Sequence, residues 1–275
     1  MPIRNKNISY RAAQLLELLI ENNQNCFSID SAYQILQDSN TNAVKRLLSD
    51  MTKRGLLMRI KDGIYFIIPF DQDPETFMPD RNLLSQYLVG NADYYIAYYS
   101  ALQIHSLTTQ PNFKQQIVVG KQIKPSALMV KDVHFQFIYH NKKHFFGNKK
   151  TWIDSFNKVQ CSDVEKTIID GLFKPQYAGG ITEITKAIYK SKDKIDYQKL
   201  LQYAILFDSQ AVIKRLGFLL EIIDVKNSII HDLQKFKTNS IVLLEPSYPK
   251  TGKAISRWSV QQNIDNDSLI SPIFT

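Results

Sequence analysis

Several features that mark common protein classes are missing from this chain of 275 residues. Its two cysteines, Cys26 and Cys161, lie in unrelated segments without CxxC spacing, so the sequence predicts neither a disulfide framework nor a zinc site. No apolar run approaches the roughly 18 residues of a membrane-spanning helix, and the first residues, MPIRNKNISY, lack the apolar core of a signal peptide. We therefore expect a cytoplasmic protein without a membrane partner.

Familiar catalytic motifs are also lacking. The sequence contains no P-loop, GxGxxG, HExxH or GxSxG motif, and it has no Gly-Ser dipeptide of the kind that precedes the paired aspartates of nucleotidyltransferases. His134, His140 and His144 have no acidic or cysteine companion at metal-ligand spacing. The sequence therefore predicts no enzyme, no catalytic residue, no metal site and no cofactor.

Positive charge, by contrast, is in excess. The chain has 34 Lys and Arg against 26 Asp and Glu, a formal net charge of +8. Such an excess favours a polyanionic partner but does not distinguish DNA, RNA or an acidic membrane. Residues 114–158, with nine lysines against two aspartates, carry most of the net charge. Residues 1–69 have nine basic against six acidic side chains, and the basic ones concentrate on the elements expected to contact DNA.

The clearest pattern in the chain lies in residues 41–53. At about 100° per residue, Val44, Leu47, Leu48 and Met51 fall on one side of a helix, which is therefore expected to pack against a core. The other side is polar and positively charged, which suits the donors and acceptors of a DNA major groove. The residues predicted to contact DNA on this side are Thr41, Asn42, Lys45, Arg46, Ser49 and Lys53.

A basic hairpin follows this helix. Gly55 is expected to end the helix, and two alternating strands over residues 56–60 and 64–68 surround a turn at Lys61-Asp62-Gly63. A helix followed by a basic-tipped hairpin is the order of a winged helix-turn-helix. Arg59 and Lys61 are predicted to contact phosphates, which orient a protein on DNA without specifying the sequence.

The remaining patterns predict two domains. Helices are expected over residues 8–22 and 30–37, with a turn at Asp38-Ser39-Asn40, and the acidic, proline-rich residues 71–79 are typical of a linker. We predict a winged helix-turn-helix DNA-binding domain at 1–70 and a C-terminal domain at 80–275. Strand patterns over 116–120, 133–139 and 149–153 alternate with later helical ones, so the expected fold class is α+β, an N-terminal winged helix-turn-helix followed by a larger mixed α/β domain.

A second group of lysines lies in this larger domain. Lys142, Lys143, Lys149 and Lys150 flank the aromatic run His144-Phe145-Phe146. One interpretation is a solvated hairpin surface. The other is a second phosphate-binding face along which DNA is wrapped or bent. The sequence leaves both open.

Four segments of the predicted second domain share a recognisable order and spacing. They are Tyr99-Ser-Ala-Leu-Gln-Ile-His-Ser-Leu-Thr, Glu165-Lys-Thr-Ile-Ile-Asp-Gly-Leu-Phe-Lys-Pro with Gly179-Gly180 after it, Arg215-Leu-Gly-Phe-Leu-Leu-Glu, and Glu245-Pro-Ser-Tyr-Pro leading to Arg257-Trp258. Together they resemble the AbiEi family, the antitoxins and transcriptional repressors of the type IV AbiE toxin–antitoxin operons that act in phage defence by abortive infection. The family often has His-Gly-Leu where this chain has His105-Ser106-Leu107.

The resemblance implies an autoregulating, DNA-binding transcriptional repressor. Its winged helix would bind inverted repeats of double-stranded DNA in its own promoter. Its C-terminal AbiEi-like antitoxin domain would oppose a nucleotidyltransferase-like toxin without forming a stable complex with it.

Two other functions remain open from the residues. One is a metal-dependent DNA nuclease with a winged-helix targeting domain, for which Asp224-Val225-Lys226 has a suitable local spacing. The other is a protein-interaction module that uses the winged fold without DNA.

Overall fold

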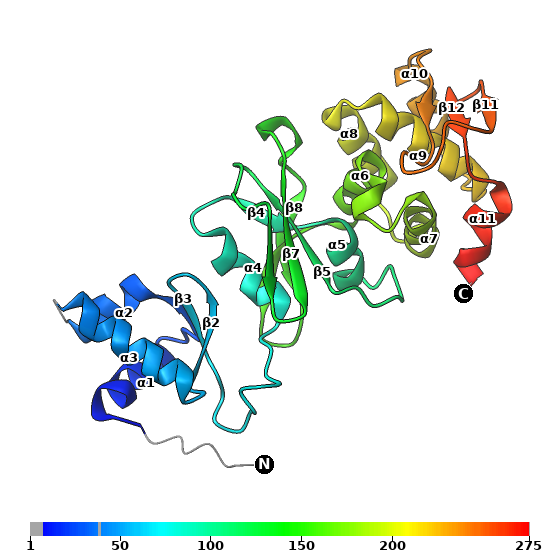
Figure 1. Ribbon diagram of the computed structural model, residues 1–275. Coiled ribbons are helices and arrows are strands. Elements are labelled where there is room, and N and C mark those ends of the chain that lie inside the picture. Colours follow the sequence, from blue (N-terminus) through cyan, green and yellow to red (C-terminus); the bar gives the residue numbers. More distant parts are fainter. Residues whose placement is uncertain (1–7, 38–39, 275) are drawn as a thin grey trace. The chain divides into compact units, whose positions relative to one another are not determined.

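The computed structural model of the protein describes residues 8–37 and 40–274. Its fold is α+β, and the described residues form eleven α-helices and three sheets (Figure 1). Residues 1–7 of the predicted first domain, and Asp38 and Ser39 of the predicted turn, lie outside the described residues. The chain divides into two compact units, the first ending at Gly90 and including Met129–Asp132, the second formed by Asn91–Leu128 and the residues from Val133 onward.

The first unit contains helices and one small antiparallel sheet with strand order β1-β3-β2. Its elements are α1 (Tyr10–Glu21), β1 (Cys26–Ser28), α2 (Ile29–Leu36), α3 (Thr41–Lys53), β2 (Leu57–Lys61), β3 (Ile64–Ile67) and α4 (Arg81–Val89). The helices and the hairpin predicted over residues 8–68 are present, with ends within two residues of those expected. The short strand β1 was not predicted from the sequence.

The core of this unit explains why these elements form. The first three helices each begin at a side-chain cap, because Ser9, Ser28 and Asn40 accept hydrogen bonds from backbone N–H groups of the first turn. The apolar stripes of α1 and α3 meet over fully buried side chains, among them Leu15 and Leu48. Burial of such stripes contributes most of the stability of short helices.

The acidic segment after β3 is part of the first unit and is not a free linker. The Lys131 ammonium donates hydrogen bonds to the carbonyl oxygens of Pro74, Glu75 and Phe77, at 3.2, 2.9 and 2.5 Å. The boundary between the units consequently follows Gly90, whereas the sequence placed it at residues 71–79. Composition could not reveal this, because the lysine that holds the segment lies more than 50 residues further along the chain.

Apart from the last two residues of β6, the second unit contains the large sheet, with strand order β6-β7-β5-β4-β9-β8. Its strands are β4 (Tyr94–Ile96), β5 (Lys114–Val119), β6 (Ala127–Val130), β7 (Val133–Tyr139), β8 (Asn148–Trp152) and β9 (Lys158–Ser162). β5 pairs with β7, and β4 with β9, in parallel, whereas β4–β5 and β8–β9 are antiparallel pairs. Of these strands, β5, β7 and β8 were predicted from the sequence.

The helices of the second unit pack against a core that they share with the large sheet. They are α5 (Tyr98–Ile104), α6 (Val164–Phe173), α7 (Ile181–Ser191), α8 (Tyr197–Phe207), α9 (Gln210–Ile222), α10 (Ile229–Phe236) and α11 (Asn266–Ile270), joined by the short helices η1 (Lys142–His144), η2 (Pro175–Tyr177) and η3 (Ser271–Phe274). α6 contacts α5, α7, α8 and α9 and so lies at the centre of the helical part (Figure 1). In the described part of the chain, each helix is too short or too polar to cross a membrane.

A small sheet completes the second unit. It is formed by β10 (Val242–Leu243), β11 (Lys253–Ile255) and β12 (Val260–Gln262), in the order β10-β12-β11. The parallel β10–β12 pair and the antiparallel β11–β12 pair bring residues 242–262 together beside α9.

Candidate nucleic-acid interface

One side of α3 is entirely exposed. Val44, Leu48 and Met51 are buried and Leu47 is half-buried, so the apolar stripe packs as the periodicity predicts. The six side chains predicted to contact DNA all lie on the exposed surface of the first unit: Thr41, Asn42, Lys45, Arg46, Ser49 and Lys53. Three of them carry a positive charge, and Asp50 is the only acidic residue of the helix. The face is therefore polar, cationic and open to solvent.

Arg59 is also exposed, on strand β2 next to this helix. It forms an ion pair with Asp62 in the hairpin turn, with side-chain exposures of 55% for Arg59 and 93% for Asp62. An ion pair between such exposed groups contributes about 0–1 kcal/mol. The Arg59 guanidinium can therefore exchange Asp62 for a phosphate at little cost.

Lys61 does not point into solvent as the sequence predicted. Its ammonium donates a hydrogen bond of 2.8 Å to the carbonyl oxygen of Leu88, in the last turn of α4. Burial lowers the pKa of Lys61, which is half-buried. A β-bulge between Arg59 and Lys61 shifts the register of β2 against β3, and bulges redirect the side chains around them. In this structure Lys61 holds α4 and does not extend the cationic face.

The four lysines of the second unit do not share one face. Lys142 and Lys143 are exposed in η1, and the Lys143 ammonium forms an ion pair of 2.5 Å with Asp208. Lys149 and Lys150 are neighbours on β8, opposite Cys161 and Gln160 of β9. Because successive side chains of a strand point to opposite sides of a sheet, these two lysines point away from each other. The predicted second phosphate-binding face is therefore divided.

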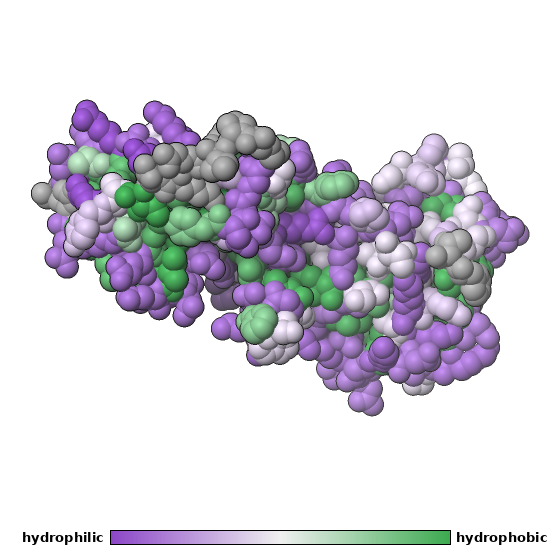
Figure 2. Space-filling view, turned by 90° about the horizontal axis from the view of Figure 1, so that it is seen from below, coloured by the Kyte–Doolittle hydropathy of each residue, from purple (hydrophilic) through white to green (hydrophobic). Residues whose placement is uncertain are grey.

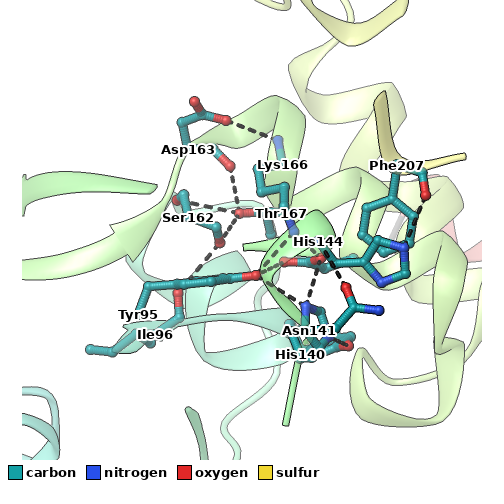
Figure 3. A network of polar contacts seen from close by, with 12 residues as sticks. Tyr95, Ile96, His140, Asn141, His144, Ser162, Asp163, Lys166, Thr167 and Phe207 are labelled. Atoms are coloured by element: carbon teal, nitrogen blue, oxygen red, sulfur yellow. Dashed lines mark hydrogen bonds and ion pairs between the residues drawn. The ribbon is translucent and has the colours of Figure 1, made fainter. Parts of the chain in front are cut away.

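A buried polar network, which the sequence did not reveal, lies in the second unit (Figure 3). The Tyr95 hydroxyl contacts Asp170 Oδ2 at 3.1 Å, His140 Nδ1 at 3.3 Å and Lys166 Nζ at 3.0 Å. The Lys166 ammonium also pairs with Asp170 one helical turn later, and the Tyr98 hydroxyl contacts His140 Nε2 at 2.8 Å. All five side chains are at most 2% exposed.

Burial determines the protonation of this network. It lowers the pKa of Lys166 and raises the pKa of Asp170, and in each case the partner's opposite charge counteracts the shift. Burial also lowers the pKa of His140 to about 2, and the nearby positive charges of Lys166 and Lys174 act in the same direction. His140 is thus neutral at pH 7. These groups lie in the core of the second unit, where solvent does not reach them.

The neutral His140 predicts acid sensitivity. In the unfolded chain its imidazole gains a proton below its ordinary pKa of 6.5, whereas in the folded chain it stays neutral down to about 2. The unfolded state then binds more protons, so the free energy of unfolding should fall by up to about 1.4 kcal/mol per pH unit as the pH drops below 6.5. Burial lowers the pKa of His105 and His144 as well, which adds to the slope.

Urea unfolding at a series of pH values, followed by tryptophan fluorescence, measures this slope. His140→Gln should lower the slope by up to about 1.4 kcal/mol per pH unit, the contribution of one proton, because the amide does not titrate. The amide can still hydrogen-bond to Tyr95 and Tyr98. An unchanged slope in this variant would contradict the assignment of His140.

The spacing that favoured a nuclease does not form a metal site here. Asp224 and Lys226 follow α9 and form an ion pair on the surface, with exposures of 77% and 82%. Within residues 8–37 and 40–274, no group of three His, Cys, Asp or Glu side chains is arranged to hold a metal ion.

The segments that carry the AbiEi resemblance meet in the second unit. The Arg215 guanidinium donates to the carbonyl oxygens of Leu172, at 2.6 Å, and Leu243, at 3.0 and 2.8 Å. The Glu245 carboxylate accepts a hydrogen bond of 2.8 Å from the backbone N–H of Ile181, directly after Gly180. Arg215 therefore connects α9 to α6 and to β10, and Glu245 caps the N-terminus of α7.

Trp258 completes these contacts. Its indole Nε1 donates a hydrogen bond of 2.7 Å to the Glu221 carboxylate, which also accepts one of 2.5 Å from Arg257. Its ring packs on Gly217, where an added Cβ would come within 2.0 Å of the ring. The motif residues thus position helices and loops of the second unit, a role that their spacing alone did not show.

Comparison with known proteins gives a likeness in fold. No family model matches the chain, and no curated protein matches it. The crystal structure of the Rv2827c protein from Mycobacterium tuberculosis matches with a TM-score of 0.69 at 13% sequence identity, covering 99% of this chain and 97% of that one. At this identity the likeness concerns the fold alone.

Proposed function

We propose that the protein is a DNA-binding transcriptional repressor whose first unit is a winged helix-turn-helix with α3 as the recognition helix. The observation that carries the proposal is the exposed, cationic side of α3, opposite the stripe that packs into the core. The helix comes after α2 in the chain and before the β2–β3 hairpin, the order in which a winged helix-turn-helix presents its reading elements.

The side chains of this face suit the chemistry of a major groove. At about 1.5 Å per residue, a helix of 13 residues is about 20 Å long. With its side chains an α-helix is about 10–12 Å in diameter, which fits the major groove of about 12 Å width. Asn42 and Ser49 can hydrogen-bond to base edges. Lys45 and Arg46 can donate to guanine or to phosphate oxygens. Sequence preference would then come from a few central side chains and affinity from the surrounding charges.

The hairpin contributes one phosphate contact. Arg59 is exposed, and its surface partner Asp62 is easily displaced. Lys61 is excluded from this role, because its ammonium is bound to the Leu88 carbonyl group. The contact set that we propose is therefore Arg59 with the six residues of α3.

The biological role that we propose is the one that the AbiEi resemblance implies. The protein would bind inverted repeats in its own promoter and act as the antitoxin of an adjacent nucleotidyltransferase-like toxin, without a stable complex. The four segments behind the resemblance, which meet around α6, α7 and α9, support a shared architecture for the second unit.

Binding to the DNA upstream of the gene tests the repressor function. Fluorescence anisotropy with a duplex that contains the inverted repeat, and with a duplex of shuffled sequence, should give a preference of about 1,000-fold or more at physiological salt. Equal affinity for the two duplexes would reject a sequence-specific repressor. Incubation with plasmid and Mg²⁺ or Mn²⁺ separates this proposal from a nuclease, since a repressor leaves the plasmid intact.

Co-expression tests the antitoxin function. Cells that express the adjacent toxin should recover growth when this protein is present, while affinity purification of either partner should not retain the other. Failure to restore growth would limit the function to repression.

A further inference from the structure

The β8–β9 hairpin ends in a turn that displays aromatic side chains to solvent. In the turn, the Asp154 carboxylate accepts hydrogen bonds of 2.7 Å from the backbone N–H groups of both Phe156 and Asn157. The Asn157 amide donates back to Asp154 at 2.9 Å, and the Ile153 N–H donates to the Asn157 carbonyl at 3.0 Å. These bonds fix the turn, yet Phe156 is 90% exposed. A well-ordered turn thus holds a phenyl ring in water.

The same end of the hairpin carries an exposed tryptophan between lysines. Trp152 is 57% exposed and lies opposite Lys158, whose ammonium is 4.1 Å from the centre of the indole ring. Lys150 lies two residues before Trp152, on the same side of the sheet and about 7 Å away along the strand. The other side of the hairpin is different, because Val159 and Cys161 there are buried in the unit. We call Lys150, Trp152, Phe156 and Lys158 the aromatic–lysine tip.

Among the exposed large hydrophobic side chains of the described residues, Phe156 has the highest exposed fraction, 90%. Figure 2 shows hydrophilic residues over most of the visible face, with hydrophobic residues in smaller patches between them. Covering an exposed aromatic ring with a partner removes apolar surface from water, which is favourable. The lysines beside the rings make an anionic partner favourable, and the one acidic group, Asp154, has its carboxylate engaged in the turn.

We propose that the aromatic–lysine tip binds single-stranded DNA, with unpaired bases stacked on Trp152 and Phe156 and phosphates paired with Lys150 and Lys158. Aromatic rings beside cations are the elements that hold single strands without sequence preference, because every base offers a flat face. In a duplex these faces are covered by neighbouring base pairs, so the tip favours a single strand over a duplex. The choice of DNA over RNA rests on the proposed function of the first unit.

The two tryptophans provide a direct readout of stacking. Trp258 is fully buried and hydrogen-bonded to Glu221, whereas Trp152 is exposed. Titration of the full-length protein with an oligothymidylate of about 15 nucleotides should therefore quench the Trp152 emission and leave that of Trp258. A duplex of the same length should quench much less.

Variants at the tip identify the contacts. Phe156→Ala should weaken binding of the single strand by about tenfold, and the double variant K150E/K158E by more, as measured by anisotropy of labelled oligothymidylate. These side chains are exposed, so circular dichroism should show an unchanged fold. Trp152→Phe keeps a ring for stacking, so it should retain most of the affinity while losing the quenching signal.

Separate variants distinguish this proposal from that for α3. K45E/R46E should lose operator duplex binding and keep oligothymidylate quenching, whereas K150E/K158E should show the reverse. The assignment to single-stranded DNA would be overturned if oligothymidylate did not quench the emission, or if duplex DNA quenched it equally. It would also be overturned if oligouridylate bound more strongly, or if phosphatidylserine vesicles quenched equally.

Discussion

Charge reversal at the centre of α3, in the variant K45E/R46E, should weaken operator binding by about 100-fold or more at physiological salt. Each contact of this kind contributes about 1–3 kcal/mol, and reversal replaces attraction to phosphate or guanine with repulsion. Lys45 and Arg46 are exposed, so neither side chain contributes to the core of the first unit. Thermal unfolding followed by circular dichroism should therefore change little, and the loss of affinity can be attributed to the interface.

A matched control separates local contact from net charge. K190E/K194E makes the same change in formal charge at two exposed lysines of the second unit, on α7 and just after it. If net charge alone governed binding, the two double variants would weaken it equally. We expect the control to lower affinity far less.

The salt dependence of binding shows what the two residues touch. Each phosphate contact contributes about 0.9 to the slope of log K against log salt. If Lys45 and Arg46 both contact phosphates, neutralising them to Gln should reduce the slope by about two. An unchanged slope with lower preference for the inverted repeat would assign them to base edges. If K45E/R46E kept full affinity for the operator, the proposal that α3 is the recognition helix would be rejected.

Lys166→Met should destabilise the second unit by about 3–5 kcal/mol. The substitution leaves the Asp170 carboxylate fully buried without its cation, and an unpaired buried charge is among the costliest changes in a protein interior. Met has nearly the length of Lys, so a cavity does not account for the loss. Urea unfolding followed by tryptophan fluorescence reports on this unit, because both tryptophans belong to it.

The double variant K166M/D170L tests this explanation. Replacing both members of a buried ion pair by apolar residues is often neutral or stabilising, so the double variant should recover much of the stability lost in Lys166→Met. Lys190→Met on the exposed end of α7 is the control, with an expected change within about 0.5 kcal/mol. If Lys166→Met costs no more than this control, the pair does not hold the core together.

Local patterns in the sequence foretold the first unit well. The apolar period of α3 and the alternation of β2 and β3 are properties of short segments, and a period of 3.6 or 2 specifies which side packs. The same reasoning gave the exposed residues of α3. It did not give the position of Lys61, because a β-bulge and a carbonyl group 27 residues away determine where that ammonium lies.

The second unit depends more on contacts between distant segments. Lys166 and Asp170 have the spacing of a surface ion pair on a helix, and only the packing of Tyr95, His140 and Phe207 around them makes the pair a buried one. Lys149 and Lys150 are successive residues of a strand, so their side chains point to opposite sides of the sheet. A count of charges over residues 114–158 does not distinguish the two sides. Charge totals therefore predicted a partner class, and geometry decided which side chains can act together.

The anchoring of residues 74–77 by Lys131 means that the contacts of the first unit are complete only when the chain extends to that lysine. The first unit is discontinuous in sequence, since it includes Met129–Asp132. During translation, the carbonyl groups of Pro74, Glu75 and Phe77 can form these hydrogen bonds only after Lys131, more than 50 residues later, has been synthesised. A gene fragment that stops at Gly90 would encode α3 and its exposed cationic face but omit the lysine that holds residues 74–77.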